Sequence, residues 1–407
     1  MQLKQNIFNY LTANLIASFT SFIISLYLSR TITPTDYGLI GIFQSLTIFL
    51  IPFATFGMAS FISIYKAKYA HFKYLTFRKR LSSFILMNYI ILSSVTLLYS
   101  INTDYLEISS LIIIFGIFSI CNSIHQSEQI ADSESKNFGI LLVYSSLVSL
   151  LLTVITISIL DLTWRGRLVS LILTEVFIFL IRKHYFNFKI EFSFCKKNIR
   201  QYIKFYKLGT PYVISVFFTW FFNGFDRIFL NNYYSLHEVG LFSLSINFVT
   251  IILIINTTIA NAAQPLLLKI LNEKKGARSL FIAPFLYLPC IFSIISIIYL
   301  LIANYFTKYI SKSYYGIEDV FLLQALGASF QGIYYFVGPV FDYYKLQLQK
   351  LYILMLSSFF AVCATFLLKG TYSFYAPAIG SAIGFCLLAL FSYKIISAEL
   401  KKRGVLL

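Results

Sequence analysis

Nearly the whole chain divides into apolar runs of about 20 residues that are separated by short polar breaks. A bilayer has a hydrocarbon core about 30 Å thick, so a helix needs about 20 apolar residues to cross it. Twelve such runs occur, at residues 7–29, 38–64, 81–101, 107–126, 138–160, 166–182, 208–230, 240–264, 280–303, 317–340, 351–369 and 376–396. Hydrophobic residues make up 58% of the 407 residues and charged residues only 12%, which is too apolar for a water-soluble protein. The sequence therefore predicts an all-α integral membrane protein with about twelve transmembrane helices.

A short sequence phrase occurs twice, at an offset of almost half the chain. Residues 28–39 are LSRTITPTDYGL and residues 230–241 are LNNYYSLHEVGL, 202 positions later. Because six apolar runs lie in each half, the repeat indicates two tandem six-helix bundles related by pseudo-two-fold symmetry, with the functional site between them. We expect an N-terminal bundle at 1–185, a basic cytoplasmic linker at 186–207 and a C-terminal bundle at 208–407.

The positive charges are distributed unequally between the two sides of the predicted membrane domain. If the N-terminus is cytoplasmic, 26 of the 33 Lys and Arg residues lie in the inner segments. This bias places both termini in the cytoplasm and explains the net charge of +17 without nucleic acid. The longest connection, 182–207, carries eight of these charges; it could lie along anionic headgroups with its phenylalanines in the interface, or form a short amphipathic strand at 186–194.

Polar residues inside the predicted spans indicate where a substrate would bind. The first span carries Asn14 and four serines at helical spacing along one face that leads to Arg30, and the seventh carries a similar stripe that ends at Asp226. Such groups avoid lipid, because an ionised side chain at the bilayer centre costs at least about 2.5 kcal/mol. We therefore predict a hydrophilic cavity lined by the first, second, seventh and eighth spans. The predicted substrate-binding residues are Arg30, Arg227, Asn223, Asn14, Asn247, Asn261 and Gln44.

Several charged residues have two possible roles. The guanidinium of Arg227 could grip a phosphate with its fork of donors, or it could extend to the outer headgroups, and Arg30 has the same two explanations. Asp226 and Glu175 are candidate coupling-ion sites. Glu175 lies in the middle of the sixth span and could instead be a buried, hydrogen-bonded carboxyl, since Arg165 and Arg167 of the same helix are too far away for a direct pair.

Two further acids lie in the repeated phrase and have a structural explanation. Asp36 and Glu238 each precede the repeated glycine by two residues, where an acid stabilises a helix N-terminus. The sequence contains no phosphate-binding glycine loop, serine elbow or His/Glu metal pair, and its five cysteines lack ligand spacing. No cofactor, no metal and no enzymatic activity are predicted.

Four segments resemble the polysaccharide-export flippases of bacterial O-antigen and capsule pathways. They are LSRTITPTDYGL after the first span, the stretch Gly209 to Pro211 that opens the seventh, FDRIFL at 225–230 and HEVGLFS at 237–243. These flippases belong to the multidrug, oligosaccharidyl-lipid and polysaccharide exporter (MOP) superfamily. The resemblance covers the chain end to end, because the span number, the repeat and the basic linker also fit.

The resemblance implies a V-shaped pair of bundles that moves an undecaprenyl-pyrophosphate-linked oligosaccharide from the cytoplasmic to the outer leaflet of the bacterial plasma (inner) membrane by alternating access. The cavity of the family is cationic, and Arg30 and Arg227 are the positions that could supply this charge. The middle of the first and second spans contains no Lys or Arg, so phosphate would be held nearer the outer mouth. Partners could include membrane lipid, a polysaccharide polymerase and a chain-length regulator.

Two other functions remain as alternatives. A cation-coupled multidrug antiporter of the same superfamily would have the same architecture, but an ionisable acid is then expected in the first span, and none lies between Ile7 and Ser29. A membrane polysaccharide polymerase would need a large outer loop with basic catalytic residues, whereas the predicted outer loops are short.

Overall fold

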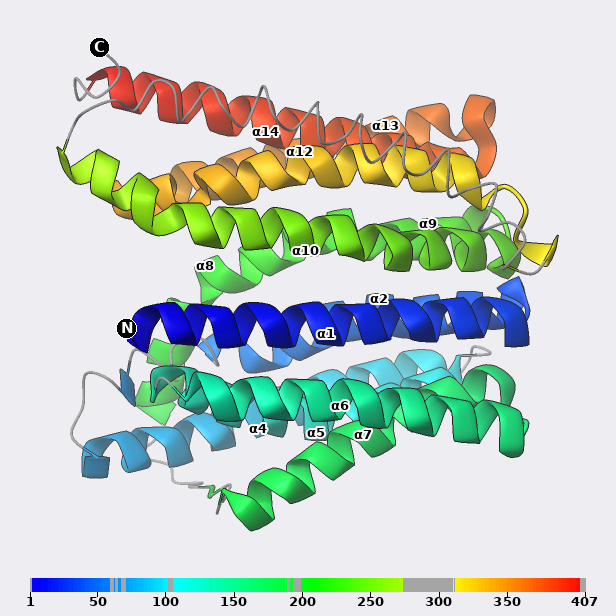
Figure 1. Ribbon diagram of the computed structural model, residues 1–407, viewed down its shortest axis with the longest axis horizontal. Helices are drawn as coiled ribbons and strands as arrows, with labels where there is room; N and C mark the ends of the chain where they lie inside the picture. Colours follow the sequence, from blue (N-terminus) through cyan, green and yellow to red (C-terminus); the bar gives the residue numbers. More distant parts are fainter. Residues whose placement is uncertain are drawn as a thin grey trace. The chain divides into compact units, whose positions relative to one another are not determined.

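The protein is helical throughout the part of the chain that the structure describes. The computed structural model describes residues 2–58, 62, 65–66, 71–101, 105–132, 134–186, 188, 191–192, 199–273, 310 and 312–402, and within these ranges no strand occurs. The long helices are α1 (Gln2–Thr31), α2 (Pro34–Thr55), α4 (His71–Ser100), α5 (Leu106–Ala131), α6 (Ser135–Val154), α7 (Thr163–Tyr185), α8 (Ile199–Asn223), α9 (Phe225–Tyr233), α10 (Leu236–Glu273), α12 (Ile317–Tyr343), α13 (Gln347–Tyr372) and α14 (Ala376–Lys402) (Figure 1). A π-turn, η1 (Ile155–Ile159), extends α6, and two short 3-10 turns are η3 (Lys312–Tyr314) and η4 (Ser373–Tyr375).

Every predicted span overlaps a helix except 280–303, which lies outside the described residues; the second span, 38–64, overlaps α2 as far as Thr55. Among the described residues, eight helical segments are long and apolar enough to cross a membrane, and the pair α8 and α9 adds a ninth. One of the eight, Gln347–Lys402, comprises both α13 and α14. α7 is not among them because it carries charged residues along most of its length. The prediction of an all-α membrane protein is confirmed.

The predicted seventh span is not one straight helix. α8 and α9 meet at a bend of 50°, with Gly224 between them. Glycine is a poor helix former because its backbone loses the most freedom on ordering, and Asn-Gly is a frequent turn dipeptide. The bend turns the polar residues of α9 in a direction different from those of α8.

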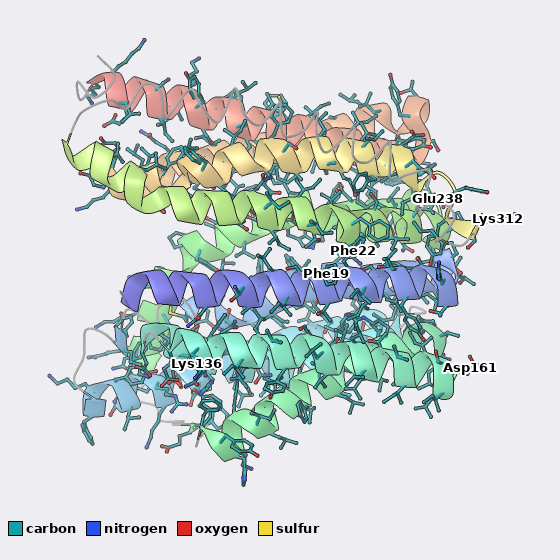
Figure 2. All side chains as sticks on the ribbon, in the orientation of Figure 1. Phe19, Phe22, Lys136, Asp161, Glu238 and Lys312 are labelled. Carbon is teal, nitrogen blue, oxygen red and sulfur yellow. The ribbon has the colours of Figure 1, made fainter. Side chains whose placement is uncertain are left out.

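The chain forms two compact units, and α1, α2 and α8 each contribute to both. Unit 1 comprises Met1–Ile24 and Leu39–Trp220, and unit 2 comprises Ser25–Gly38 and Phe221–Leu407. In unit 1, α7 packs against α5 and α6. Lys136 and Asp161 lie at opposite ends of the helix formed by α6 and η1, as expected for a span with its basic end in the cytoplasm (Figure 2).

An aromatic cluster forms much of the core of unit 1. Phe84 of α4 is fully buried, and its ring contacts those of Tyr202, Phe205 and Tyr206 on α8. The Tyr206 hydroxyl donates a hydrogen bond of 2.5 Å to Asn88 Oδ1, so the polar end of the ring is satisfied as well. These contacts explain why α8 begins at Ile199, before the predicted start at residue 208, although the first turns are rich in Lys and Arg.

Unit 2 is built on close packing between small residues. α12 packs against α10 and α14, and α14 against α13, as nearly parallel rods (Figure 1). A Cβ added at Gly380 would lie 2.2 Å from Thr365 Oγ1, and one added at Gly384 would lie 2.6 Å from the Ala361 Cβ. Small residues of this kind let helix backbones approach closely where lipid supplies no hydrophobic driving force between helices.

The repeated phrase forms the same helix cap twice. Thr33 precedes α2 and accepts a backbone hydrogen bond from Asp36 at 3.2 Å, while its hydroxyl donates to the Asp36 carboxylate at 3.0 Å. At the equivalent positions before α10, the Ser235 hydroxyl donates to the Glu238 carboxylate. Both arrangements satisfy groups at a helix start and place an acid at its positive end. The acids therefore have the capping role that their sequence positions indicate.

The two caps also pack against each other reciprocally within unit 2. A Cβ added at Gly38 would lie 2.2 Å from the Leu236 carbonyl oxygen, and one added at Gly240 would lie 1.8 Å from the Pro34 carbonyl oxygen. Pro34 and Leu236 are the first residues of α2 and α10, and they are 202 positions apart, as are the two glycines. We call the contact formed by residues 33–38 and 235–240 the repeat junction. It permits only glycine at the two central positions.

Candidate functional site

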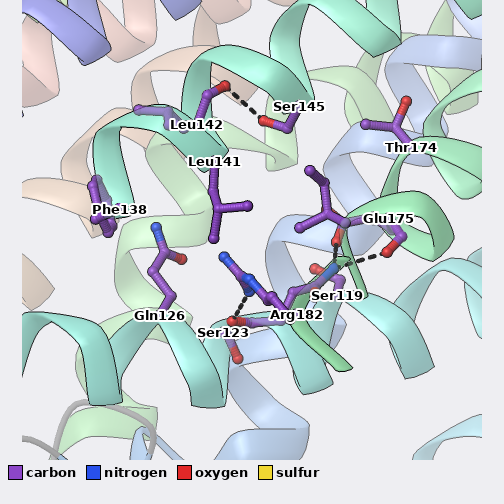
Figure 3. A pocket seen from close by; sticks show the side chains of 12 residues that line it. Ser119, Ser123, Gln126, Phe138, Leu141, Leu142, Ser145, Thr174, Glu175 and Arg182 are labelled. Carbon is purple, nitrogen blue, oxygen red and sulfur yellow. Dashed lines mark hydrogen bonds between the residues drawn. The ribbon is translucent and has the colours of Figure 1, made fainter. Parts of the chain in front are cut away.

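A polar cavity of about 170 Å³ lies inside unit 1, between α5, α6 and α7. In Figure 3, Arg182 lies between Gln126 and Glu175. Among the described residues that line this cavity, Glu175 is the one acid and Arg182 the one base. The remaining lining residues are polar or aliphatic, apart from Phe138 on α6: Ser119, Asn122, Ser123, Gln126, Leu141, Leu142, Ser145, Thr174 and Ile178.

Asn122 connects the two charged side chains of the cavity. Its Nδ2 donates to Glu175 Oε2 at 2.5 Å and to the Glu175 carbonyl oxygen at 3.0 Å. The backbone carbonyl oxygen of Asn122 accepts a hydrogen bond from Nη1 of Arg182. Glu175 and Arg182 are seven residues apart, about two helical turns, so both project from the same face of α7. The carboxylate and the guanidinium are therefore held near each other through one asparagine.

Arg165 and Arg167, the two arginines before Glu175 on α7, have other partners. Arg165 Nε donates to Glu107 at 2.5 Å near the start of α5, in an exposed ion pair. Arg167 is buried, and its Nη1 donates to Ser149 Oγ at 2.9 Å and to Thr153 Oγ1 at 2.8 Å on α6. The charged neighbour of Glu175 is Arg182, a residue that the sequence suggests only as a determinant of topology.

Asp226 and Arg227 form a buried polar network in unit 2. As neighbours on one helix they point apart: Asp226 accepts a hydrogen bond of 2.8 Å from Ser381 of α14, and Arg227 Nε donates to Ser243 Oγ of α10 at 3.1 Å. Arg227 Nη1 also donates to the Asn223 carbonyl oxygen at 2.6 Å. Arg227 is only 2% exposed, so in this conformation its guanidinium is enclosed by protein. Its assignment to a phosphate remains a prediction.

The other predicted substrate-binding residues occupy different environments. Asn14 and Arg30 are exposed on α1, while Gln44 of α2 and Asn223 of α8 are half-buried. Asn247 is half-buried on α10, and its Nδ2 donates to the Tyr37 hydroxyl at 2.6 Å. The side chain of Asn261 lies outside the described part of the chain. The structure brings Asn223 together with Arg227, and Asn247 with Tyr37 beside the repeat junction.

The part of the linker that precedes α8 is anchored to unit 1 through Phe188. Phe188 is buried in the core of unit 1, where the Arg78 guanidinium lies over its ring at 4.9 Å and the His125 ring packs against it at 4.7 Å. Arg78 also pairs with Glu128 of α5 at 2.8 Å. Of the possibilities that the sequence left open for this segment, a position in the lipid interface does not hold for Phe188, because its side chain faces protein. Most of the proposed strand at 186–194 lies outside the described residues.

Sequence reasoning missed Asn122 and Arg182. A single asparagine in an apolar run looks like helix-packing glue, and an arginine at a cytoplasmic helix end looks like a topology signal. The seven-residue spacing of Glu175 and Arg182 was the available signal for a shared face. In the described part of the chain, no group of three or more His, Cys, Asp or Glu side chains could hold a metal ion.

The sequence also matches a known protein family. The family model described as "Polysaccharide biosynthesis protein" matches residues 3–271, about two thirds of the chain. The chain belongs to this family. No curated protein matches the sequence of this family member.

Solved structures show the fold of this polysaccharide biosynthesis protein. An inward-facing multidrug resistance MATE family transporter of the MOP superfamily is similar with a TM-score of 0.74 and 13% identity, over 97% of this chain and 98% of that one. The lipid II flippase MurJ in an inward closed conformation is similar with a TM-score of 0.66 and 14% identity, over 97% of this chain and 91% of that one. The Vibrio cholerae MATE transporter VcmN in the bent form is similar with a TM-score of 0.55 and 17% identity, over 98% of this chain and 97% of that one. The fold is that of MOP superfamily membrane transporters.

Proposed function

We propose that this protein is a flippase that moves an undecaprenyl-pyrophosphate-linked oligosaccharide, an O-antigen or capsule repeat unit, from the cytoplasmic to the outer leaflet of the inner membrane. The observation that carries the proposal is the match to the polysaccharide biosynthesis family over residues 3–271. The fold it shares with a lipid II flippase supports it, because both substrates would be lipid-linked glycans. Both termini are proposed to be cytoplasmic, on the basis of the distribution of Lys and Arg.

The chemistry of such a substrate fits two tandem six-helix bundles with a polar groove between them. The lipid tail can stay in the bilayer while the pyrophosphate and the sugars cross through a groove that is open to lipid at the side. We assign the groove to the polar faces of α1, α2, α8 and α10, including Asn14, Gln44, Asn223, Asn247 and Asn261. Arg30, exposed at the outer end of α1, is the cation proposed to meet the pyrophosphate, with Arg227 reaching it only in another conformation.

The proposal is tested with the purified protein in liposomes that contain a fluorescent undecaprenyl-pyrophosphate oligosaccharide. A membrane-impermeant reductant destroys the label in the outer leaflet only. We expect the accessible fraction to rise above that of protein-free liposomes, and the same lipid without its glycan to be moved more slowly. Equal accessibility with and without protein would contradict the proposal.

A cation-coupled multidrug antiporter is the second candidate, because a MATE transporter gives a TM-score of 0.74. One observation argues against an antiporter. An antiporter of this superfamily is expected to carry an acid in its first span, and α1 contains none. The same liposomes, loaded with ethidium and given an ion gradient, separate the two functions. Gradient-driven loss of ethidium without movement of the lipid-linked glycan would favour the antiporter.

A further inference from the structure

The cavity between α5, α6 and α7 contains buried polar atoms that lack a protein partner. Asn122 Oδ1 and Arg182 Nε have no hydrogen-bond partner, although both residues line the cavity and are only 6% exposed. One atom is an acceptor and the other a donor, so a molecule that both donates and accepts would satisfy them. Water does so, and a cavity of about 170 Å³ has room for about five waters at roughly 30 Å³ each.

The hydroxyl groups of the cavity also favour a chain of waters. Ser123, Ser145 and Thr174 donate their hydroxyl hydrogens to backbone carbonyls of their own helices, at 2.8, 2.8 and 2.7 Å. Their oxygens can therefore only accept hydrogen bonds from the cavity. Together with Asn122 Oδ1 and the Glu175 carboxylate, they form a lining rich in acceptors around one ionisable acid. Acceptors of this kind can take the hydrogen of a protonated carboxyl group.

Apart from Arg182, none of the other titratable groups described on α5, α6 and α7 lines the cavity. On α5, the Glu128 carboxylate is held by Arg78 and Tyr74, and the His125 ring packs against Phe188. Of the remaining groups, Glu107 pairs with Arg165, Arg167 is bound to α6, and Cys121 is half-buried on α5, where it interacts electrostatically with Glu175. The other side chains are exposed: Lys136, Tyr144, Lys183, His184 and Tyr185. Glu175 is left as the acid that the cavity water reaches.

We propose that Glu175 is a proton-binding site, reached through the water in this cavity, whose occupancy is coupled to transport. In the proton-transfer step a hydronium ion gives its proton to a Glu175 carboxylate oxygen, leaving a carboxylic acid and a water molecule. Protonation removes the negative charge next to the buried Arg182 guanidinium. A buried charge without a counter-charge is costly, so the packing of α7 against α5 through Asn122 weakens. The bound proton thus favours a different arrangement of these helices.

A carbodiimide tests the site without any substrate, because it adds to protonated carboxyl groups in apolar surroundings. The purified full-length protein in liposomes is treated with dicyclohexylcarbodiimide, and the adduct is located by mass spectrometry. We expect labelling of Glu175 to rise as the pH of the medium is lowered. Asn122→Leu should change the pH dependence of this labelling, because the carboxylate loses its amide donor. Glu134→Gln, which alters an exposed acid between α5 and α6, should change nothing.

The transport measurement rests on the proposed flippase function. Its outcomes distinguish failure of the proton site from failure of the flippase function. We expect a pH gradient to accelerate movement of the lipid-linked glycan by the wild type but not by Glu175→Gln. Labelling of Glu175 that does not depend on pH, or a gradient response that survives in Glu175→Gln, would overturn the proton site. If the wild type moves no glycan while Glu175 still labels with pH, the flippase assignment falls and the proton site stands.

Discussion

Buried arginines in this protein donate to neutral oxygens. Arg167 donates to two hydroxyls of α6, Arg182 to the backbone of α5, and Arg227 to Ser243 and to a backbone oxygen. Each partner lies at least four residues away in sequence, and most lie on another helix. The sequence could show that a charge lies within an apolar run, but which oxygen meets it depends on helix packing, and single-sequence patterns do not encode that packing.

At Arg227, a structural role and a substrate role predict different results. Arg227→Ala removes two buried hydrogen bonds and leaves a cavity, so we expect the free energy of unfolding to fall by about 2–4 kcal/mol. Arg30→Ala, at an exposed site on α1, should change stability by less than about 0.5 kcal/mol. Thermal unfolding of the detergent-solubilised proteins measures both. Unchanged stability of Arg227→Ala, combined with loss of glycan movement, would show that the guanidinium serves the substrate.

The helices themselves were largely predictable, whereas their irregularities were not. Runs of apolar residues located α4, α5, α12, α13 and α14 to within a few residues at most ends, because a bilayer fixes both length and composition. The bend at Gly224 was missed, although Asn-Gly is a turn signal, because the apolar residues Ile228 to Leu230 look like the end of the same span. The burial of Phe188 was missed because its alternation with charged residues resembles an interfacial segment.

The repeat junction gives a prediction for the element that carries it. Gly240→Ala puts a methyl group against the Pro34 carbonyl, so α2 and α10 have to separate. On a background without native cysteines, we expect Ser29→Cys, which is fully buried, to react faster with a membrane-impermeant thiol reagent when Gly240→Ala is present. Gly338→Ala is the matched control, because a Cβ there meets nothing within 4 Å. Equal reaction rates in both backgrounds would mean that the junction accommodates the methyl group.

For the molecule as a whole, composition and repeat were enough to predict the fold class. Family membership and the shared fold of MOP transporters agree with that prediction. The groove between the halves remains a prediction. The cavity of Glu175 lies inside one unit, and the sequence repeat provided no reason to expect it there.

The predicted topology can be tested along the entire chain. We expect single cysteines to react only from the cytoplasmic side at four basic positions and only from the outer side at three positions near the predicted outer turns. The inner positions are Lys79, Lys197, Arg278 and Lys402, and the outer positions are Thr35, Leu236 and Ser313. The basis is the excess of Lys and Arg in inner segments. Reaction of the cysteine at Lys197 from the outside would contradict the twelve-span topology.

The reciprocal glycine contact has the form of an isologous interface, in which the same patch on two copies meets itself and every contact occurs twice. Here the two copies are joined in one polypeptide, so each of the two equivalent contacts can be altered alone. The close approach at the junction needs glycine at both positions, because Gly38 and Gly240 lie next to each other. A Cβ added at Gly38 would be 3.4 Å from the backbone nitrogen of Gly240. The double alanine variant should therefore open the junction little more than either single variant, a non-additivity that distant sites do not show.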